Sequence, residues 1–214
     1  MELSRLCEMQ GISGREELVR MAIFRECAEV LGEENVKIDR TGNVIAHKAC
    51  RKADAPRVMV AAHMDEVGFL VSKITENGMI KFLTVGSIDP RVMIGRKMKV
   101  GYKKLPGVIS LKAIHLTTPA ERKVAPGASS LYIDIGASSK AEAERYVRIG
   151  DPCYFDSPFE EFGDMRIKSK AIDDRVGCAV MLALMQKDLP YDTYFVFATN
   201  EEIGGSRGAM TAAI

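Results

Sequence analysis

The 214-residue sequence contains no tryptophan, and aromatic residues make up only 7% of it. That leaves few rings to stack against sugars, which argues against a carbohydrate-binding surface. No charge sign is in excess either, because 30 basic residues balance 29 acidic ones to a net charge of +1. Nucleic acids and anionic membranes are bound largely through excess positive charge. We therefore expect no nucleic-acid partner and no membrane partner.

Long apolar runs and paired cysteines are also missing. No stretch approaches the roughly 18 consecutive apolar residues that a membrane helix needs. The first residues, Met1–Gly11, lack the basic start and apolar run of a secretory signal. The cysteines are odd in number, widely spaced and without a Cys-x-x-Cys pair, which indicates reduced thiols. They are Cys7, Cys27, Cys50, Cys153 and Cys178. These features together predict a cytoplasmic protein.

Both ends of the chain carry the pattern of an α/β domain. Ser13, followed by Glu16 three positions later, predicts a helix start with Ser13 as its N-cap, and apolar residues at helical spacing follow. A second helix is predicted over Asp174–Gln186. Val58–Ala62 and Tyr194–Ala198 are continuous apolar runs, which are typical of strands buried on both faces.

The middle of the chain has a different character. Short β-rich pieces alternate there with Gly, Pro and polar turns, which predicts a small barrel or sandwich. The pieces are Phe69–Ile74, Met79–Val85, Lys97–Gly101, Gly107–Lys112 and Leu131–Ile135. We therefore expect an α/β domain built from residues 1–68 and 165–214. A β-rich domain over residues 69–164 would interrupt it.

Polar residues follow the first apolar run directly, at a position where open α/β sheets bind ligands. In an extended chain, His63 and Asp65 share one face. Asp65 would then be placed to hold one imidazole nitrogen while the other binds a metal ion. By itself, the short His-x-Asp pattern fits a loop histidine between solvated acids better than a metal ligand.

Two pairs of adjacent acids stand at comparable positions. Asp173 and Asp174 open the predicted second helix, where they would either cap it or bridge two metal ions. Glu201 and Glu202 end the second apolar run. Successive strand residues point to opposite sides, so one glutamate can bind metal while the other transfers a proton. The alternative is a polar loop, although glutamates next to a buried strand are costly without partners.

Taken together, these motifs resemble the tetrahedral aminopeptidases, the family of glutamyl and deblocking aminopeptidases, some of which are labelled endoglucanases. The resemblance covers the whole chain. Further matching stretches are Ile12-Ser13-Gly14, Asp39-Arg40-Thr41-Gly42-Asn43-Val44, Tyr132–Ala137, Arg148–Asp151 and Arg207-Gly208-Ala209. The resemblance implies an α/β peptidase domain, with a mixed sheet flanked by helices, that is interrupted by an inserted β-barrel-like domain.

The resemblance also implies a site and a reaction. Two divalent metal ions, zinc or cobalt with manganese as a further option, would be bound by His63, Asp173 and Glu202. Asp173 would bridge the ions, although spacing alone leaves Asp174 open for this role, and Asp65 would orient His63. Glu201 would be the general base that takes a proton from a water activated by the two metals. Peptide substrates would lose their N-terminal residues, and the protein would form homo-oligomers through the inserted domain.

Members of the family normally have two further metal ligands, an Asp and a His, beyond the point where this sequence ends. Catalytic zinc usually keeps three protein ligands. We therefore expect an incomplete metal site and a truncated, weakly active or inactive form.

Two other readings remain. The chain would be a non-catalytic fragment that only folds and self-associates, or a glycoside hydrolase. The latter needs two acids about 5 to 9.5 Å apart and no metal, which gives His63 and Asp65 no role. The sequence has no Gly-x-Ser-x-Gly motif and no phosphate-binding P-loop, which argues against a serine hydrolase and a nucleotide enzyme.

Overall fold

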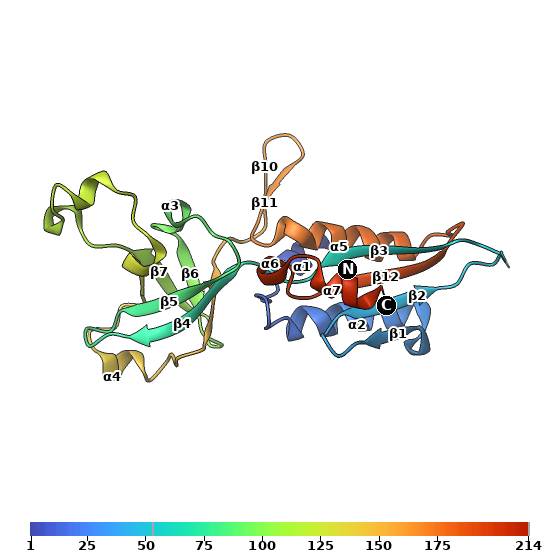
Figure 1. The fold of residues 1–214 in the computed structure, drawn as a ribbon, viewed down its shortest axis with the longest axis horizontal. Coiled ribbons are helices and arrows are strands. Elements are labelled where there is room, and N and C mark those ends of the chain that lie inside the picture. The colour runs from blue at the N-terminus through green and yellow to red at the C-terminus, as the bar shows by residue number, and fades with distance from the viewer. Residues whose placement is uncertain (53, 214) are drawn as a thin grey trace. The chain divides into compact units, whose positions relative to one another are not determined.

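The computed structural model describes residues 1–52 and 54–213. Two compact units make up the chain (Figure 1): Met1–Glu66 with Pro158–Ile214, and Val67–Ser157. Both junctions lie earlier in the sequence than the expected 68/69 and 164/165. The second differs more because the hairpin of β10 (Glu160–Phe162) and β11 (Arg166–Lys168) groups with the first unit.

A four-stranded mixed sheet forms the centre of the first unit, in the order β1-β2-β12-β3. Its strands are β1 (Val36–Ile38), β2 (Val44–Lys48), β12 (Asp192–Ala198) and β3 (Arg57–His63). The pairs β1/β2 and β2/β12 are antiparallel, whereas β12 and β3 run parallel, with Ala198 opposite His63. The carboxyl ends of β3 and β12 therefore meet at the same edge of the sheet.

Helices cover both faces of this sheet, and the alternation along β12 explains how. Phe195 and Phe197 face a core that also contains residues of α1 (Leu3–Glu8), α2 (Glu17–Leu31) and α5 (Ile172–Met185). Val196 and Ala198 point to the other face, where residues of α7 (Arg207–Ala212) pack. This period of two, from a strand rich in Phe and Val, places apolar side chains on both faces.

The expectation of burial on both faces holds for β12 but is wrong for β3. Met59 is 42% exposed, and burial begins only at Ala62. Among residues 1–52 and 54–213, β3 lies at the end of the strand order and pairs with β12 alone, so it is an edge strand with less cover.

The second unit contains a closed barrel of six strands in the order β4-β5-β8-β7-β6-β9, which confirms the predicted fold class. Phe69 in the barrel core packs edge-on against Phe82 and Phe155. The strands are β4 (Gly68–Ile74), β5 (Ile80–Val85), β6 (Lys97–Val100), β7 (Leu105–Ser110), β8 (Tyr132–Asp134) and β9 (Pro152–Phe155). Two short helices accompany them, α3 (Pro90–Met93) and α4 (Lys140–Ala143).

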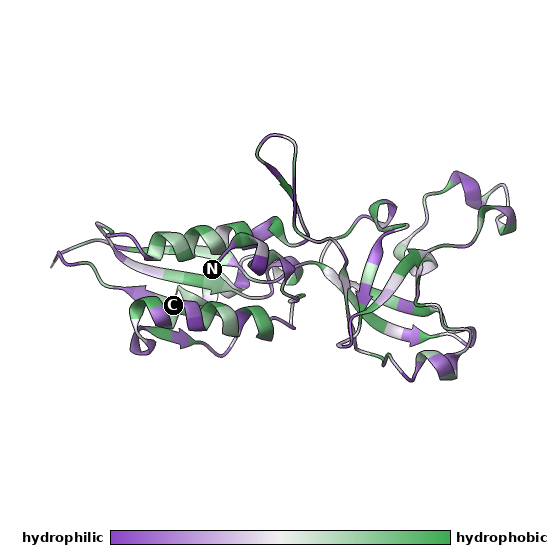
Figure 2. Ribbon diagram, turned by 180° about the vertical axis from the view of Figure 1, so that it is seen from behind, coloured by the Kyte–Doolittle hydropathy of each residue, from purple (hydrophilic) through white to green (hydrophobic). Residues whose placement is uncertain are grey.

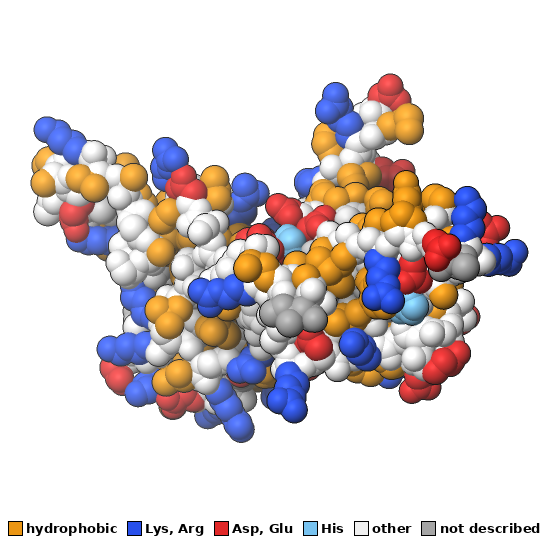
Figure 3. All heavy atoms as spheres, turned by 45° about the vertical axis from the view of Figure 1, so that its right-hand side comes forward, with side chains coloured by type: hydrophobic (Ala, Val, Ile, Leu, Met, Phe, Trp, Pro, Cys, Tyr) orange, Lys and Arg blue, Asp and Glu red, His pale blue; other side chains and the backbone are white. Residues whose placement is uncertain are grey.

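Surface and helix patterns agree with the composition. In Figure 2, α2 and α5 each show apolar residues among polar ones, as expected for helices between a core and solvent. Over the face drawn in Figure 3, acidic and basic side chains are interspersed. No helix within residues 1–52 and 54–213 is long and apolar enough to cross a membrane. All five cysteines are free, and four of them are buried.

Candidate active site

Polar side chains from three distant segments converge where β3 and β12 end. His63 is the last residue of β3, Asp173 lies in the first turn of α5, and Glu201 begins α6 (Glu201–Gly204) just after β12. His63 Nε2 lies 3.0 Å from Asp173 Oδ1 and 4.0 Å from Glu201 Oε2. The structure thus brings His63 close to two candidates that lie more than a hundred residues later in the sequence.

Both nitrogens of the His63 ring face oxygen atoms. Nδ1 lies 3.1 Å from the backbone oxygen of Asp65 and 3.5 Å from its Oδ1. The ring is 10% exposed. Burial alone would lower the pKa of His63, but the carboxylates of Asp65, Asp173 and Glu201 outweigh it and raise the pKa to about 9. The ring therefore lies among more negative charge than it can neutralise.

Asp65 links this histidine to the glutamates. Its fully buried carboxylate accepts hydrogen bonds from the Ser13 hydroxyl (2.6 Å) and from the backbone N–H groups of Glu201 and Glu202 (both 3.1 Å). Burial would raise the pKa of Asp65, but His63 and these donors lower it below its ordinary value. Asp65 is therefore held as a carboxylate.

The predicted N-cap role of Ser13 is wrong. Helix α2 begins at Glu17, and Glu16 occupies the position before it. Ser13 instead donates its hydroxyl to Asp65, a partner 52 positions away. This long-range contact cannot be read from the local capping pattern.

The expectation that Glu201 and Glu202 end a strand is also wrong. Strand β12 stops at Ala198, and Asn200 adopts a left-handed backbone conformation with φ 59°. The chain then turns into α6, where adjacent side chains diverge by about 100° rather than pointing to opposite faces. The Glu201 side chain is 42% exposed. Burial raises the pKa of Glu202, and the carboxylates of Asp173, Asp65 and Glu201 raise it further against the influence of His63.

The two aspartates at the start of α5 have different surroundings. The backbone of Asp173 and Asp174 is not helical, and Asp174 Oδ1 accepts the backbone N–H of Gly177 (3.0 Å), as an N-cap side chain does where regular helix begins. The Asp173 side chain is 89% exposed and lies against His63. Of the two readings that the sequence left open, capping suits Asp174 and a ligand role suits Asp173.

The donor set fits a divalent cation in its chemistry. An imidazole nitrogen and a carboxylate oxygen, 3.0 Å apart, face each other, and no lysine or arginine among the described residues pairs with Asp173, Glu201 or Glu202. Within the same residues, no three His, Cys, Asp or Glu side chains are grouped so as to hold one ion together. Nearby Cys178 does not add a thiolate, because burial raises its pKa to about 12.

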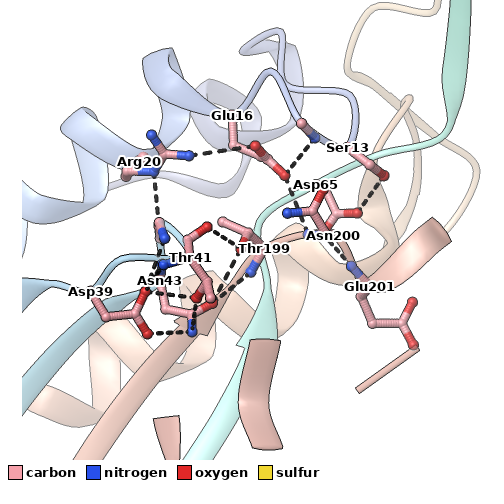
Figure 4. Close-up of polar contacts among 12 residues, drawn as sticks. Ser13, Glu16, Arg20, Asp39, Thr41, Asn43, Asp65, Thr199, Asn200 and Glu201 are labelled. Carbon is pink, nitrogen blue, oxygen red and sulfur yellow. Dashed lines mark hydrogen bonds and ion pairs between the residues drawn. The ribbon is translucent and has the colours of Figure 1, made fainter. Parts of the chain in front are cut away.

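Several residues around the site were not predicted from the sequence to have a functional role. Figure 4 shows Glu16, Asn43 and Asp65 around the backbone turn of Thr199, Asn200 and Glu201, to which each of the three side chains is hydrogen-bonded. The sequence offered only an indirect signal for them. Ile12-Ser13-Gly14 and Asp39–Val44 resemble the corresponding stretches of the aminopeptidase family, but no role was assigned to them.

Fold and site together define an α/β protein whose histidine and carboxylates gather at the carboxyl ends of adjacent parallel strands, the usual place for a ligand in such sheets. A family model described as M42 glutamyl aminopeptidase matches residues 42–214. The chain belongs to this M42 glutamyl aminopeptidase family.

Individual relatives agree. The lysyl aminopeptidase of Pyrococcus furiosus is 33% identical over 217 residues, which cover 99% of this chain and 61% of that protein. Among solved structures, an aminopeptidase from the archaeon Desulfurococcus kamchatkensis has a TM-score of 0.89 at 34% identity, with coverage of 99% of this chain and 58% of that one. The Pyrococcus horikoshii TET1 peptidase, which can assemble into a tetrahedron or a large octahedral shell, has a TM-score of 0.83 at 33% identity, with coverage of 99% and 63%. The chain thus spans about 60% of the length of these relatives.

Proposed function

We propose that this chain carries the site of a metal-dependent aminopeptidase that removes N-terminal residues from peptides. The observation that carries the proposal is the pair His63 Nε2 and Asp173 Oδ1, 3.0 Å apart, with Glu201 within 4.0 Å of the same nitrogen. It lies at the carboxyl ends of β3 and β12 in a chain of the M42 glutamyl aminopeptidase family.

His63, Asp173 and Glu202 would hold two divalent ions, zinc or cobalt with manganese as a further option, and Asp173 would be shared between them. The bound ions would lower the pKa of the attacking water and polarise the scissile carbonyl. Glu201, which is the most exposed of the carboxylates around His63 after Asp173, would take the proton and return it to the leaving amine. Asp65 would hold the imidazole in place, because its backbone oxygen and its carboxylate both lie beside Nδ1.

With these residues, each ion would have two protein ligands, fewer than the three that catalytic zinc usually has. We therefore expect these 214 residues to bind metal weakly and to turn substrate over slowly. The remaining coordination positions would be left to water and substrate.

Self-association through the inserted unit, residues 67–157, is part of the proposal, as is a cytoplasmic location. The unit exposes large apolar side chains, among them Leu83, Val92, Ile114 and Val124. The related Pyrococcus horikoshii peptidase assembles into shells. The free cysteines suit a reducing compartment.

Amino-acid release from short peptides tests the proposed reaction. With added zinc or cobalt, peptides with a free amino end should slowly lose their first residue, whereas the same peptides with an acetylated end should not. A chelator should stop the release, because the carboxylates alone do not polarise the carbonyl. Amino-acid release that persists in the presence of a chelator would contradict the proposed metal dependence. No release at all would favour a non-catalytic protein, and cleavage of cello-oligosaccharides would favour a glycoside hydrolase.

A further inference from the structure

Four consecutive backbone N–H groups, over Thr199–Glu202, are each accepted by a buried side-chain oxygen from another part of the chain. The pairs are Thr199 to Asn43 Oδ1 (3.0 Å), Asn200 to Glu16 Oε1 (3.3 Å), Glu201 to Asp65 Oδ1 (3.1 Å) and Glu202 to Asp65 Oδ2 (3.1 Å). The first N–H groups of a helix usually rely on a local cap or on water. Here Asn200, at the N-cap of α6, makes no side-chain cap.

The three acceptors belong to three separate segments. Glu16 precedes α2, Asn43 lies in the turn between β1 and β2, and Asp65 follows β3. Their exposed fractions are 1%, 0% and 0%. A buried acceptor that is already committed to one donor cannot turn to water when the turn moves. The fold therefore fixes this short turn from three sides.

Asn43 is itself held on its other side. Its Nδ2, which carries two N–H groups, has three acceptors within hydrogen-bond distance: Asp39 Oδ2 (2.7 Å), Thr41 Oγ1 (2.9 Å) and the backbone oxygen of Gly208 (2.9 Å). With Thr199 on its Oδ1, the amide uses all the hydrogen-bonding capacity it has. Its orientation is thus fixed.

Glu16 is fixed in a comparable way. Oε1 also accepts the backbone N–H of Gly14 (2.9 Å), and Oε2 lies 3.5 Å from Arg20 Nη2. Arg20 Nε in turn donates to the backbone oxygen of Gly42 (2.8 Å). Arg20 therefore links Glu16 (Figure 4) to the backbone of Gly42, the residue before Asn43.

We propose that Glu16 and Asn43 are positioning residues: through the backbone of Thr199 and Asn200, they aim the carboxylate of Glu201 at the His63–Asp173 pair. This inference rests on the proposed function. Neither side chain touches the reacting atoms, so both act through the turn. A misplacement of about 1 Å at a reacting group can cost on the order of 100-fold in rate.

Kinetics of Glu16 variants give the first test. Glu16→Ala removes the acceptor of Asn200 N–H and should lower kcat about 10- to 100-fold, with KM within about twofold. Glu16→Gln keeps a carbonyl oxygen and should restore kcat to within about threefold of the wild type. Glu17→Ala, at the exposed neighbouring position, is the matched control for the start of α2. If Glu16 had a purely structural role, Glu16→Ala would lower stability without lowering kcat selectively at constant KM.

Amide exchange followed by NMR gives a second readout that needs no turnover. Glu16→Ala should accelerate exchange of the Asn200 amide by at least about tenfold, and Glu17→Ala should not. Asn43→Ala should likewise accelerate exchange of the Thr199 amide. If that variant does not fold, the Glu16→Ala and Glu16→Gln variants test the proposal. Wild-type kcat in Glu16→Ala, in an enzyme that Glu201→Gln inactivates, would overturn the positioning role alone. Hydrolysis that survives Glu201→Gln would instead overturn the proposed function.

Discussion

Replacing Glu201 with Gln should lower the rate of peptide release at saturating zinc or cobalt by at least about 100-fold, the lower end of what a general base contributes. The amide cannot take up a proton at the pH of the reaction. The side chain is 42% exposed and its backbone N–H stays bonded to Asp65, so the fold should not change. Initial rates measured with a free-amino peptide, together with a melting curve, check the prediction.

The control and the neighbouring glutamate make this test specific. Glu29→Gln, at an exposed position of α2, should keep the wild-type rate. Glu202→Gln should weaken metal binding, so that more metal is needed for the same rate. If Glu201→Gln retained the wild-type rate and Glu202→Gln lost it at every metal concentration, the two roles would have to be exchanged.

Replacing Lys170 with Met should destabilise the first unit by about 3 kcal/mol. Lys170 Nζ lies 2.8 and 3.0 Å from the two carboxylate oxygens of Glu66 and 2.7 Å from the backbone oxygen of Met9, and the two side chains are 9% and 3% exposed. Removing one partner leaves a buried charge without its nearest counterion. The value is at the lower end of the usual range because Arg175 Nη2 remains 3.9 Å from Glu66. Urea unfolding measures the loss.

An exposed pair nearby provides the comparison. Lys168 lies 2.8 Å from Glu160, with both side chains more than half exposed, so Lys168→Met should change stability by less than about 1 kcal/mol. The double variant of Lys170→Met with Glu66→Leu should be less destabilised than the two single variants combined, since neither charge is then left alone. If Lys170→Met and Lys168→Met lowered the free energy of unfolding equally, the buried pair would contribute no more to stability than the exposed one.

The sequence was informative wherever chemistry follows a strong apolar pattern. Tyr194–Ala198 predicted β12, and the acids that follow it lie at the site because parallel strands bring their carboxyl ends together. The same reasoning placed His63 at the end of β3. The closed barrel was visible as short β-rich pieces, since its alternating strands and turns have a local signature.

Polar contacts between residues far apart in the chain could not be predicted from local sequence patterns. Glu16 and Asn200 are 184 positions apart, and Asn43 and Thr199 are 156 apart. Nothing in a single sequence pairs such residues, because their partners are backbone groups that any residue would carry. The helical turn of α6 was also not predicted, because it follows a left-handed Asn200 (φ 59°) whose backbone N–H is bonded to the distant Glu16.

The proposed metal site is tested by calorimetric titration of zinc into the 214-residue chain and its aspartate variants. Zinc should bind weakly to the wild type and not measurably to Asp173→Ala, because that carboxylate faces His63 and would be shared by both proposed ions. Asp174→Ala should retain the binding, since Asp174 caps α5 through Gly177. Zinc binding that is unchanged by Asp173→Ala, or that is lost only in Asp174→Ala, would show that Asp173 is not a metal ligand.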